Sequence, residues 1–139
     1  MLRSTIMAHM QEALTDSKFR FKQLQEINNE IPWDSLVELV KPHYLESNLN
    51  KELVPIDKML RVYFLQLRYG MSPSGVEEAL FQIEALREFA DINIDTDVIP
   101  SDTSIIRFND LIESKALKQQ IKQSFDIQPV SPQQDTKGS

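Results

Sequence analysis

The stretch from Pro55 to Tyr69, PIDKMLRVYFLQLRY, constrains the fold more than any other part of the chain. Successive residues of an α-helix advance by roughly 100°, and at that step the apolar side chains of this stretch cover most of the circumference. Pro55 suits the first helical position, where a backbone N–H has no partner within the helix. The stretch is shorter than the roughly 20 apolar residues of a membrane span. It is therefore predicted to be the buried central helix of a small all-α domain.

Three basic side chains of this helix, Lys58, Arg61 and Arg68, fall within one narrow arc of its surface. A polar arc on an otherwise apolar helix is often only the side that faces water. A row of cations can also contact the phosphates of a nucleic acid. The pattern alone leaves both interpretations open.

The charge of the chain is unevenly distributed. The net charge of −6 counts against general adhesion to nucleic acid, because domains of that kind are usually basic. The acidic residues gather between Glu77 and Asp102, where Arg87 is the only basic residue. Basic residues concentrate on the central helix and at Lys115, Lys118 and Lys122, as well as at Lys18, Arg20 and Lys22. Such a distribution permits a basic face on an acidic protein.

Local signals predict further helices on both sides of the central one. Gly70 suits the end of the central helix, and Ser72 followed by Pro73 suits the start of the next. The tight turn between them has the layout of a helix-turn-helix corner. Pro42 is predicted to end a helix that begins near Ile31, because proline disfavours the helical conformation of the preceding residue. The predicted helices span residues 18–28, 31–40, 55–69, 73–81, 84–90, 101–113 and 115–125.

The helix that starts at Ser101 or Asp102 presents a second candidate surface. Its predicted outward face carries Thr103, Arg107, Asp110 and Ser114, which are small or polar side chains with a single arginine. A face of this composition can enter a DNA groove. It can equally well face water, and the pattern does not decide between the two.

The sequence offers little for catalysis. It has no cysteine and only two histidines, and none of its three glycines lies in a phosphate-binding loop. The adjacent Glu77 and Glu78 diverge around a helix and do not form an acid–base pair. No catalytic residue, metal site or cofactor is predicted in this chain, which leaves a helical interaction domain.

The ends of the chain are predicted to differ from its middle. Residues 1–17 are expected to form a poorly ordered or helical extension, and they lack the continuous apolar core of a signal peptide. Residues 18–125 are expected to form the helical domain. Residues 126–139, rich in proline, glutamine, serine and glycine, are expected to be a disordered tail.

Several blocks of sequence, read in order, resemble the N-terminal domain of bacterial insertion-sequence transposases, the large DDE-type family that includes insertion sequence five. The blocks are IPWD (31–34), PHY (42–44), PIDKMLR (55–61), YGMS (69–72), VEEALF (76–81), REFA (87–90) and IPSDTSIIRF (99–108). The resemblance covers roughly residues 18–125.

The resemblance implies a DNA-binding domain that recognises the terminal inverted repeats of an insertion element in double-stranded DNA, in the bacterial cytoplasm at the nucleoid. In that family a catalytic domain follows, whose two Asp and one Glu hold Mg²⁺ for strand cleavage and transfer. This sequence departs from the pattern after Phe125, so the chain is expected to be truncated before that domain and to need no Mg²⁺ itself.

The family blocks coincide with the two candidate surfaces, which selects the residues expected to contact DNA. These are Lys58, Arg61, Arg68, Thr103, Ser104 and Arg107. Arg61 and Arg107 stand within the matched blocks, whereas Lys58 and Arg68 rest more on the helical arc than on the match. Thr103 and Ser104, at the N-terminus of their helix, suit a phosphate. The alternative function is a protein–protein module, which would pair with itself as a homodimer or with full-length transposase and regulate it.

Overall fold

The computed structural model describes residues 18–46 and 54–125 of the chain. These residues form helices joined by turns and loops and contain no strand, which confirms the all-α prediction. The predictions for residues 1–17 and 126–139 lie outside the described part. The helices are α2 (Lys18–Glu30), α3 (Trp33–Glu46), α4 (Ile56–Tyr69), α5 (Pro73–Gln82), α6 (Glu84–Ala90), α7 (Asp102–Ser114) and α8 (Lys118–Phe125).

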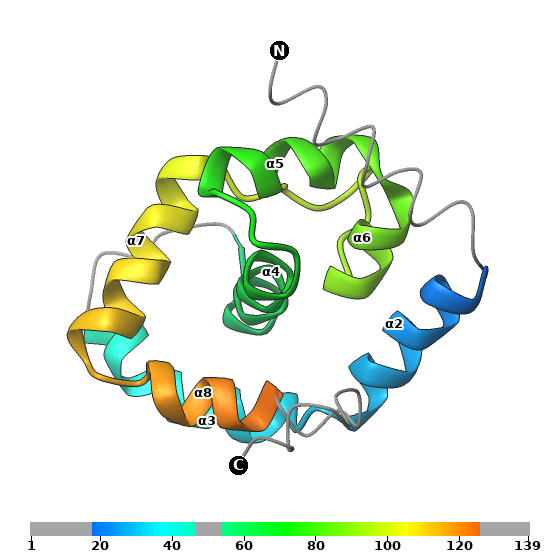
Figure 1. Ribbon diagram of the computed structural model, residues 1–139. Coiled ribbons are helices and arrows are strands. Elements are labelled where there is room, and N and C mark those ends of the chain that lie inside the picture. The colour runs from blue at the N-terminus through cyan, green and yellow to red at the C-terminus, as the bar shows by residue number, and fades with distance from the viewer. Residues whose placement is uncertain (1–17, 47–53, 126–139) are drawn as a thin grey trace.

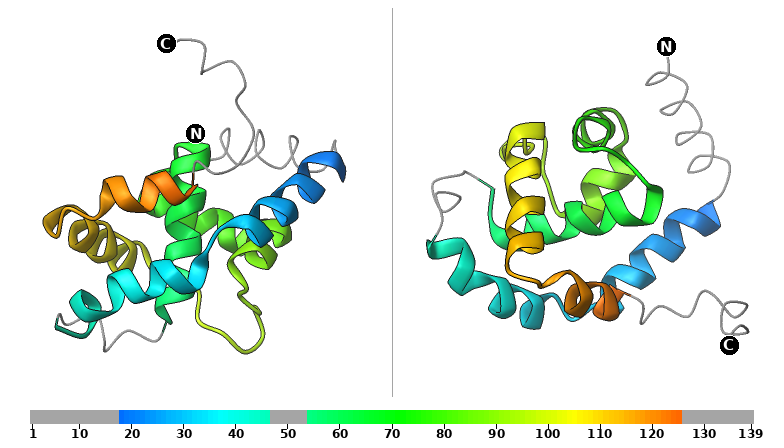
Figure 2. Two further views of the ribbon diagram at one scale, coloured as in Figure 1. Left: turned by 90° about the horizontal axis from the view of Figure 1, so that it is seen from below. Right: turned by 60° about the vertical axis from the view of Figure 1, so that its left-hand side comes forward.

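Helix α4 is the centre of the domain, and the other helices surround it (Figure 1). The two further views show the same arrangement (Figure 2). Helix α3 crosses below α4, while α7 and α8 follow one edge of the domain. The prediction of a buried central helix is confirmed, because seven consecutive or nearly consecutive side chains of α4 are buried. They are Met59, Leu60, Val62, Tyr63, Phe64, Leu65 and Gln66.

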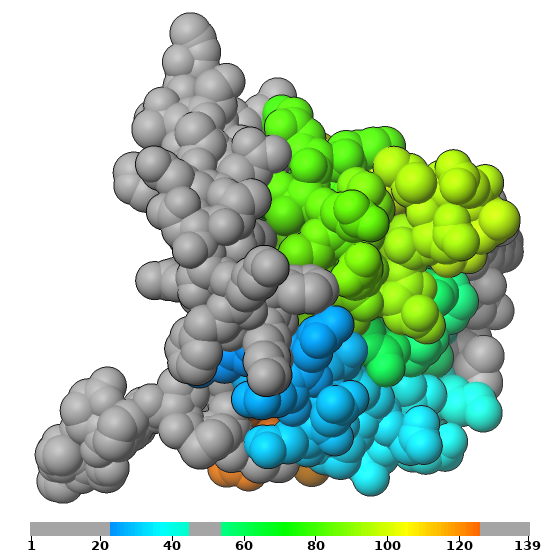
Figure 3. Space-filling view, turned by 90° about the vertical axis from the view of Figure 1, so that its right-hand side faces the viewer, coloured from blue at the N-terminus to red at the C-terminus, as the bar shows by residue number. Residues whose placement is uncertain are grey.

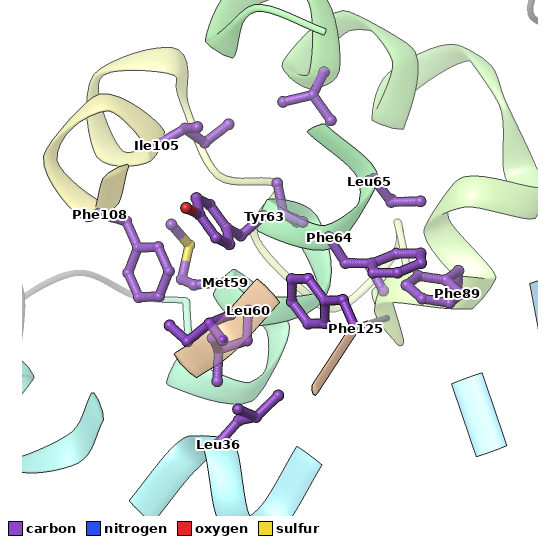
Figure 4. Packing of buried hydrophobic residues seen from close by; sticks show 14 of the residues in the cluster. Leu36, Met59, Leu60, Tyr63, Phe64, Leu65, Phe89, Ile105, Phe108 and Phe125 are labelled. Atoms are coloured by element: carbon purple, nitrogen blue, oxygen red, sulfur yellow. The ribbon is translucent and has the colours of Figure 1, made fainter. Parts of the chain in front are cut away.

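An aromatic cluster, Trp33, Phe64, Phe89 and Phe125, holds four helices together. The Phe64 ring stacks on that of Phe89 at 5.1 Å and meets that of Phe125 edge-on at 4.9 Å (Figure 4). The Trp33 ring lies 6.1 Å from Phe89 and 6.0 Å from Phe125. Each of these distances is within the range in which aromatic pairs add to the energy of burial. The cluster therefore joins α3, α4, α6 and α8.

The ends of several helices follow the predicted capping groups. Gly70 ends α4 in the left-handed conformation with φ 63°, which costs glycine nothing. The Ser72 hydroxyl accepts a hydrogen bond from the Gly75 N–H at 3.0 Å at the start of α5. The sequence predicts Pro55 as the first residue of the central helix. In the structure α4 begins one residue later, at Ile56, and Pro55 is its N-cap. The turn between α4 and α5 forms the predicted corner (Figure 1).

The prediction that Pro42 ends its helix is wrong, because α3 continues through it to Glu46. Proline removes one backbone hydrogen bond, and the carbonyl that loses its donor, that of Glu38, belongs to an exposed residue that water can reach. The continued helix brings Tyr44 into the core, where its hydroxyl donates to the Val54 carbonyl at 3.1 Å. Burial of Tyr44 offsets the local cost of Pro42. The helix itself begins at Trp33, two residues after Ile31.

The last helix also starts later than predicted, at Lys118 and not at Lys115. Residues 115–117 form a turn, in which Ala116 has φ 56°. The turn closes α7, because the Leu117 N–H donates to the Ile112 carbonyl at 3.0 Å. It also directs Leu117 into the core together with Ile121 and Phe125. Burial of Leu117 favours a conformation that alanine alone would avoid.

Candidate nucleic-acid interface

The six residues predicted to contact DNA lie on two helices that pack together but turn these residues in different directions. On α4, Tyr63 marks the side that faces α7, because its ring lies 6.2 Å from that of Phe108. Helical geometry places Arg61 and Arg68 roughly 160° and 140° around α4 from Tyr63. Both arginines therefore point away from α7. The structure does not combine them with Arg107 into one surface.

Lys58 is used inside the domain. Its side chain is 15% exposed, and its ammonium group donates to the backbone carbonyl of Asp91. The same group lies 3.3 Å from the Asp91 carboxylate and 4.0 Å from that of Asp97. Lys58 thus ties the first turn of α4 to the loop of residues 91–101. Its charge is largely compensated by these two acids.

Arg61 is also held by its neighbours, and its side chain is 16% exposed. One guanidinium nitrogen lies 2.9 Å from the Asp57 carboxylate one turn earlier. The guanidinium carbon lies 4.7 Å from the centroid of the Trp33 ring, which is the geometry of a cation–π interaction. The structure therefore gives Arg61 both a counter-charge and an aromatic surface.

Asn28 connects this arginine to the surrounding helices. Its side-chain oxygen accepts a hydrogen bond from the Trp33 indole N–H at 2.8 Å and one from Arg61 at 3.5 Å. Its amide nitrogen donates to the carbonyl of Phe89 at 3.4 Å. These bonds link α2, α3, α4 and α6. Sequence patterns do not reveal this role of Asn28, because two of its partners, Arg61 and Phe89, lie 33 and 61 residues away along the chain.

The N-terminus of α7 is already occupied by protein groups. The Ser101 hydroxyl accepts from the Ser104 N–H at 3.2 Å, and the Glu77 carboxylate accepts from the Asp102 N–H at 3.0 Å. Ser104 is buried, and its hydroxyl accepts a hydrogen bond from Ser101 at 3.2 Å. A phosphate approaching this helix end would meet the negative charge of Glu77. Thr103 next to it is exposed.

Arg68 and Arg107 are the two predicted cations that lie at the surface. Arg68 is in the last turn of α4, with its guanidinium carbon 5.9 Å from the Tyr69 ring centroid. Arg107 lies on the outward face of α7 beside Ile106, a large apolar side chain that is 46% exposed. The outward positions of Thr103, Arg107 and Asp110 agree with the predicted face of α7.

The acidic segment folds into a pocket of about 510 Å³ that the sequence did not predict. The pocket lies between α6 and the loop of residues 91–101. Figure 3 shows the side of the domain on which these two segments, coloured light green to yellow-green, lie. Its lining contains two basic side chains, Lys58 and Arg87, and a larger number of acids. The acidic residues are Glu84, Glu88, Asp91, Asp95 and Asp97. The excess of acids gives this face a negative potential, which disfavours contact with DNA.

Two further properties bear on the chemistry of the described residues. Residues 18–46 and 54–125 contain no group of three His, Asp or Glu side chains placed to hold a metal ion. Within the same residues, no helix combines the length and the apolar character that crossing a membrane requires.

A comparison with families of known proteins gives a match over most of the chain. Residues 1–111 match the family model described as "Transposase domain (DUF772)". The matched segment takes in the helices from α2 to most of α7 and stops before α8. No solved structure matches the chain.

Proposed function

The chain belongs to the DUF772 family of transposase domains, and from this membership we propose that it is a DNA-binding domain that recognises the ends of an insertion element. The family match over residues 1–111 is the observation that carries the proposal. The proposal assigns binding to the described helices and leaves strand cleavage to a separate DDE-type catalytic domain with its Mg²⁺.

Within this proposal the six predicted residues divide into two groups. Arg68, Thr103 and Arg107 are exposed, and we assign them to contacts with the DNA backbone. Lys58, Arg61 and Ser104 hold the scaffold, since each is engaged by neighbouring groups of the protein. The two arginines point to different sides of the domain, so they would contact different stretches of a bent or long DNA site.

An electrophoretic mobility shift over a range of salt concentrations tests the proposal. One duplex carries the end of the element in which the gene lies, and a second has the same composition in scrambled order. We expect retardation that weakens steeply with salt, because bound phosphates release counterions. Arg107→Gln should lower the salt slope by about 1, the change expected for one lost phosphate contact.

Lys41→Gln is the matched control for Arg107→Gln, because Lys41 is an exposed cation on α3 outside the proposed surface. It should leave the slope unchanged. Failure of the unmodified protein to retard either duplex at low salt would refute DNA binding.

A second function, a dimerisation or regulatory module that acts on full-length transposase, is favoured by exposed apolar side chains. Phe81 is 54% exposed on α5, and Ile94 and Val98 are 47% and 46% exposed in the loop of residues 91–101. Size-exclusion chromatography with light scattering tests it. A monomer at all concentrations that also fails to bind the full-length transposase would exclude this function.

A further inference from the structure

Helix α8 and the turn before it carry a cationic surface that the sequence pattern did not include among the DNA-contacting residues. Lys115, Lys118 and Lys122 are all exposed, and we name them the lysine edge. The segment from Ser114 to Phe125 contains no acidic residue. The other exposed long side chains of α8 are Gln119, Gln120 and Gln123, which are uncharged hydrogen-bonding groups. This segment is therefore positive in an acidic protein, and Glu113 directly before it is the acid that pairs with it.

The lysine edge is held on a rigid element. Leu117 in the preceding turn and Ile121 and Phe125 on α8 are at most 5% exposed and anchor the helix to the core. At roughly 100° per residue, Lys118 and Lys122 border this buried side of α8. Lys118 and Lys122 are four residues apart, so they share one face with a spacing of about 6 Å along the axis. Figure 2 shows α8 at the outer edge of the domain, next to α7.

The charges of the lysine edge are available to a partner. Neither Lys115 nor Lys122 forms an ion pair with any residue that the structure describes. Lys118 lies 3.8 Å from the Glu113 carboxylate, but both side chains are about half exposed or more, at 46% and 64%. An exposed pair of this kind is held weakly, so Lys118 can exchange Glu113 for another anion. This differs from Lys58 and Arg61, whose charges are compensated inside the domain.

We propose that the lysine edge contacts the phosphate backbone of duplex DNA, as a surface additional to Arg68 and Arg107. The inference rests on the proposed DNA-binding function and locates a part of it outside the segment that matches the family. Duplex DNA carries one negative charge per about 1.7 Å of its axis, so a short row of ammonium groups meets several phosphates.

The other anionic partner that the chemistry allows is an acidic protein surface, such as the acid-lined pocket of a second copy. That pocket is a weaker attractor than DNA, because Lys58 already compensates Asp91 and Asp97 within it and Arg87 adds a second positive charge. Charge density therefore favours DNA as the partner of the lysine edge.

The test measures the salt dependence of DNA binding by the full chain and by a triple variant, Lys115→Gln, Lys118→Gln and Lys122→Gln. The slope of log affinity against log salt should become less steep by about 2 to 3, because each lost phosphate contact removes about 0.9. The effect should be similar for element-end and scrambled duplexes, since phosphate contacts carry no sequence information. The three side chains are exposed, so the variant should keep its helical circular dichroism.

A matched triple variant with arginine at the same three positions keeps the charges and should retain the slope of the unmodified protein. If the unmodified protein shows steep salt dependence and the glutamine variant has the same slope, the lysine edge is excluded and the proposed function stands. If the unmodified protein binds no DNA, both the proposed function and the role of the lysine edge are refuted. A glutamine variant that loses only self-association in the absence of DNA, with the slope unchanged, would assign the edge to a protein partner and overturn the proposal.

Discussion

At the scale of single residues, Tyr63 joins α4 to both α7 and α8. Its ring lies 6.2 Å from that of Phe108 and 6.3 Å from that of Phe125 (Figure 4). Burial raises the pKa of Tyr63 above the ordinary 10.0, and the negative charge of Glu113 raises this pKa further. The neutral hydroxyl is therefore preferred in the folded state more strongly than in the unfolded chain.

This raised pKa predicts a dependence of stability on alkaline pH. Below pH 10 the tyrosine is neutral in both states, and its contribution to stability is fully present. As the pH rises above 10 the unfolded chain loses this proton first, so the free energy of unfolding falls until the raised folded pKa is passed. Tyr63→Phe should reduce this fall. Urea unfolding at a series of pH values from 8 to about 11 measures it; equal pH dependence in both proteins would contradict the assignment.

At the scale of helices, ends that depend on local groups could be predicted from the sequence, and those that depend on distant partners could not. Gly70, Ser72 and Ser101 act on the backbone next to them, and each ends or starts its helix as predicted. Pro42 failed as a stop signal because α3 gains the burial of Tyr44 against Val54 and Phe108. The sequence near Pro42 contains no sign of this packing.

The features of the candidate site also divide into those that local sequence predicts and those that depend on distant residues. The helical period placed Lys58, Arg61 and Arg68 on α4 and Arg107 on the outward face of α7. The period cannot reveal that Lys58 pairs with Asp91, which lies 33 residues away, or that Arg61 covers Trp33. The pattern of charge along one helix therefore predicts in which direction its basic side chains point, but not whether other parts of the protein already engage them.

The helix α3 gives a prediction about Pro42. Replacing it with alanine should restore a backbone hydrogen bond to the Glu38 carbonyl and remove the steric cost of a helical proline, about 3 kcal/mol. Loss of the proline also makes the unfolded chain more flexible, which lowers the free energy of unfolding by about 0.4–1 kcal/mol. We expect Pro42→Ala to increase the free energy of unfolding by about 2–2.6 kcal/mol, measured by urea unfolding. Pro32→Ala is the control, because Pro32 precedes α3, and it should not stabilise. A loss of stability for Pro42→Ala would show that the proline is favourable where it stands.

At the scale of the whole molecule, the folded unit is larger than the segment that matches the family. The match ends at residue 111, whereas the core includes Leu117, Ile121 and Phe125 of the following turn and α8. Phe125 lies 4.9 Å from Phe64 and 6.0 Å from Trp33, so it completes the aromatic cluster at the centre. Residues 112–125, the described part of the chain after the match, are therefore integral to the fold.

Truncation of the Phe125 side chain tests this conclusion. Phe125→Ala should lower the free energy of unfolding by about 3–5 kcal/mol, the usual cost of removing a buried phenyl ring. Phe81→Ala, at a side chain that is 54% exposed, should cost much less. Chemical denaturation of both variants measures the difference. Equal small losses would mean that α8 docks on a core that is complete without it.

The position of Trp33 makes it an intrinsic fluorescence probe of folding. It is the only tryptophan in the chain, it is 7% exposed, and its ring contacts both the Phe89 and Phe125 rings of the aromatic cluster and the Arg61 guanidinium. Unfolding would expose the indole to water and shift its emission to longer wavelength. A variant of the lysine edge that lost affinity while keeping this emission spectrum would have lost only its electrostatic attraction to the duplex, and fluorescence would distinguish that result from a collapse of the fold.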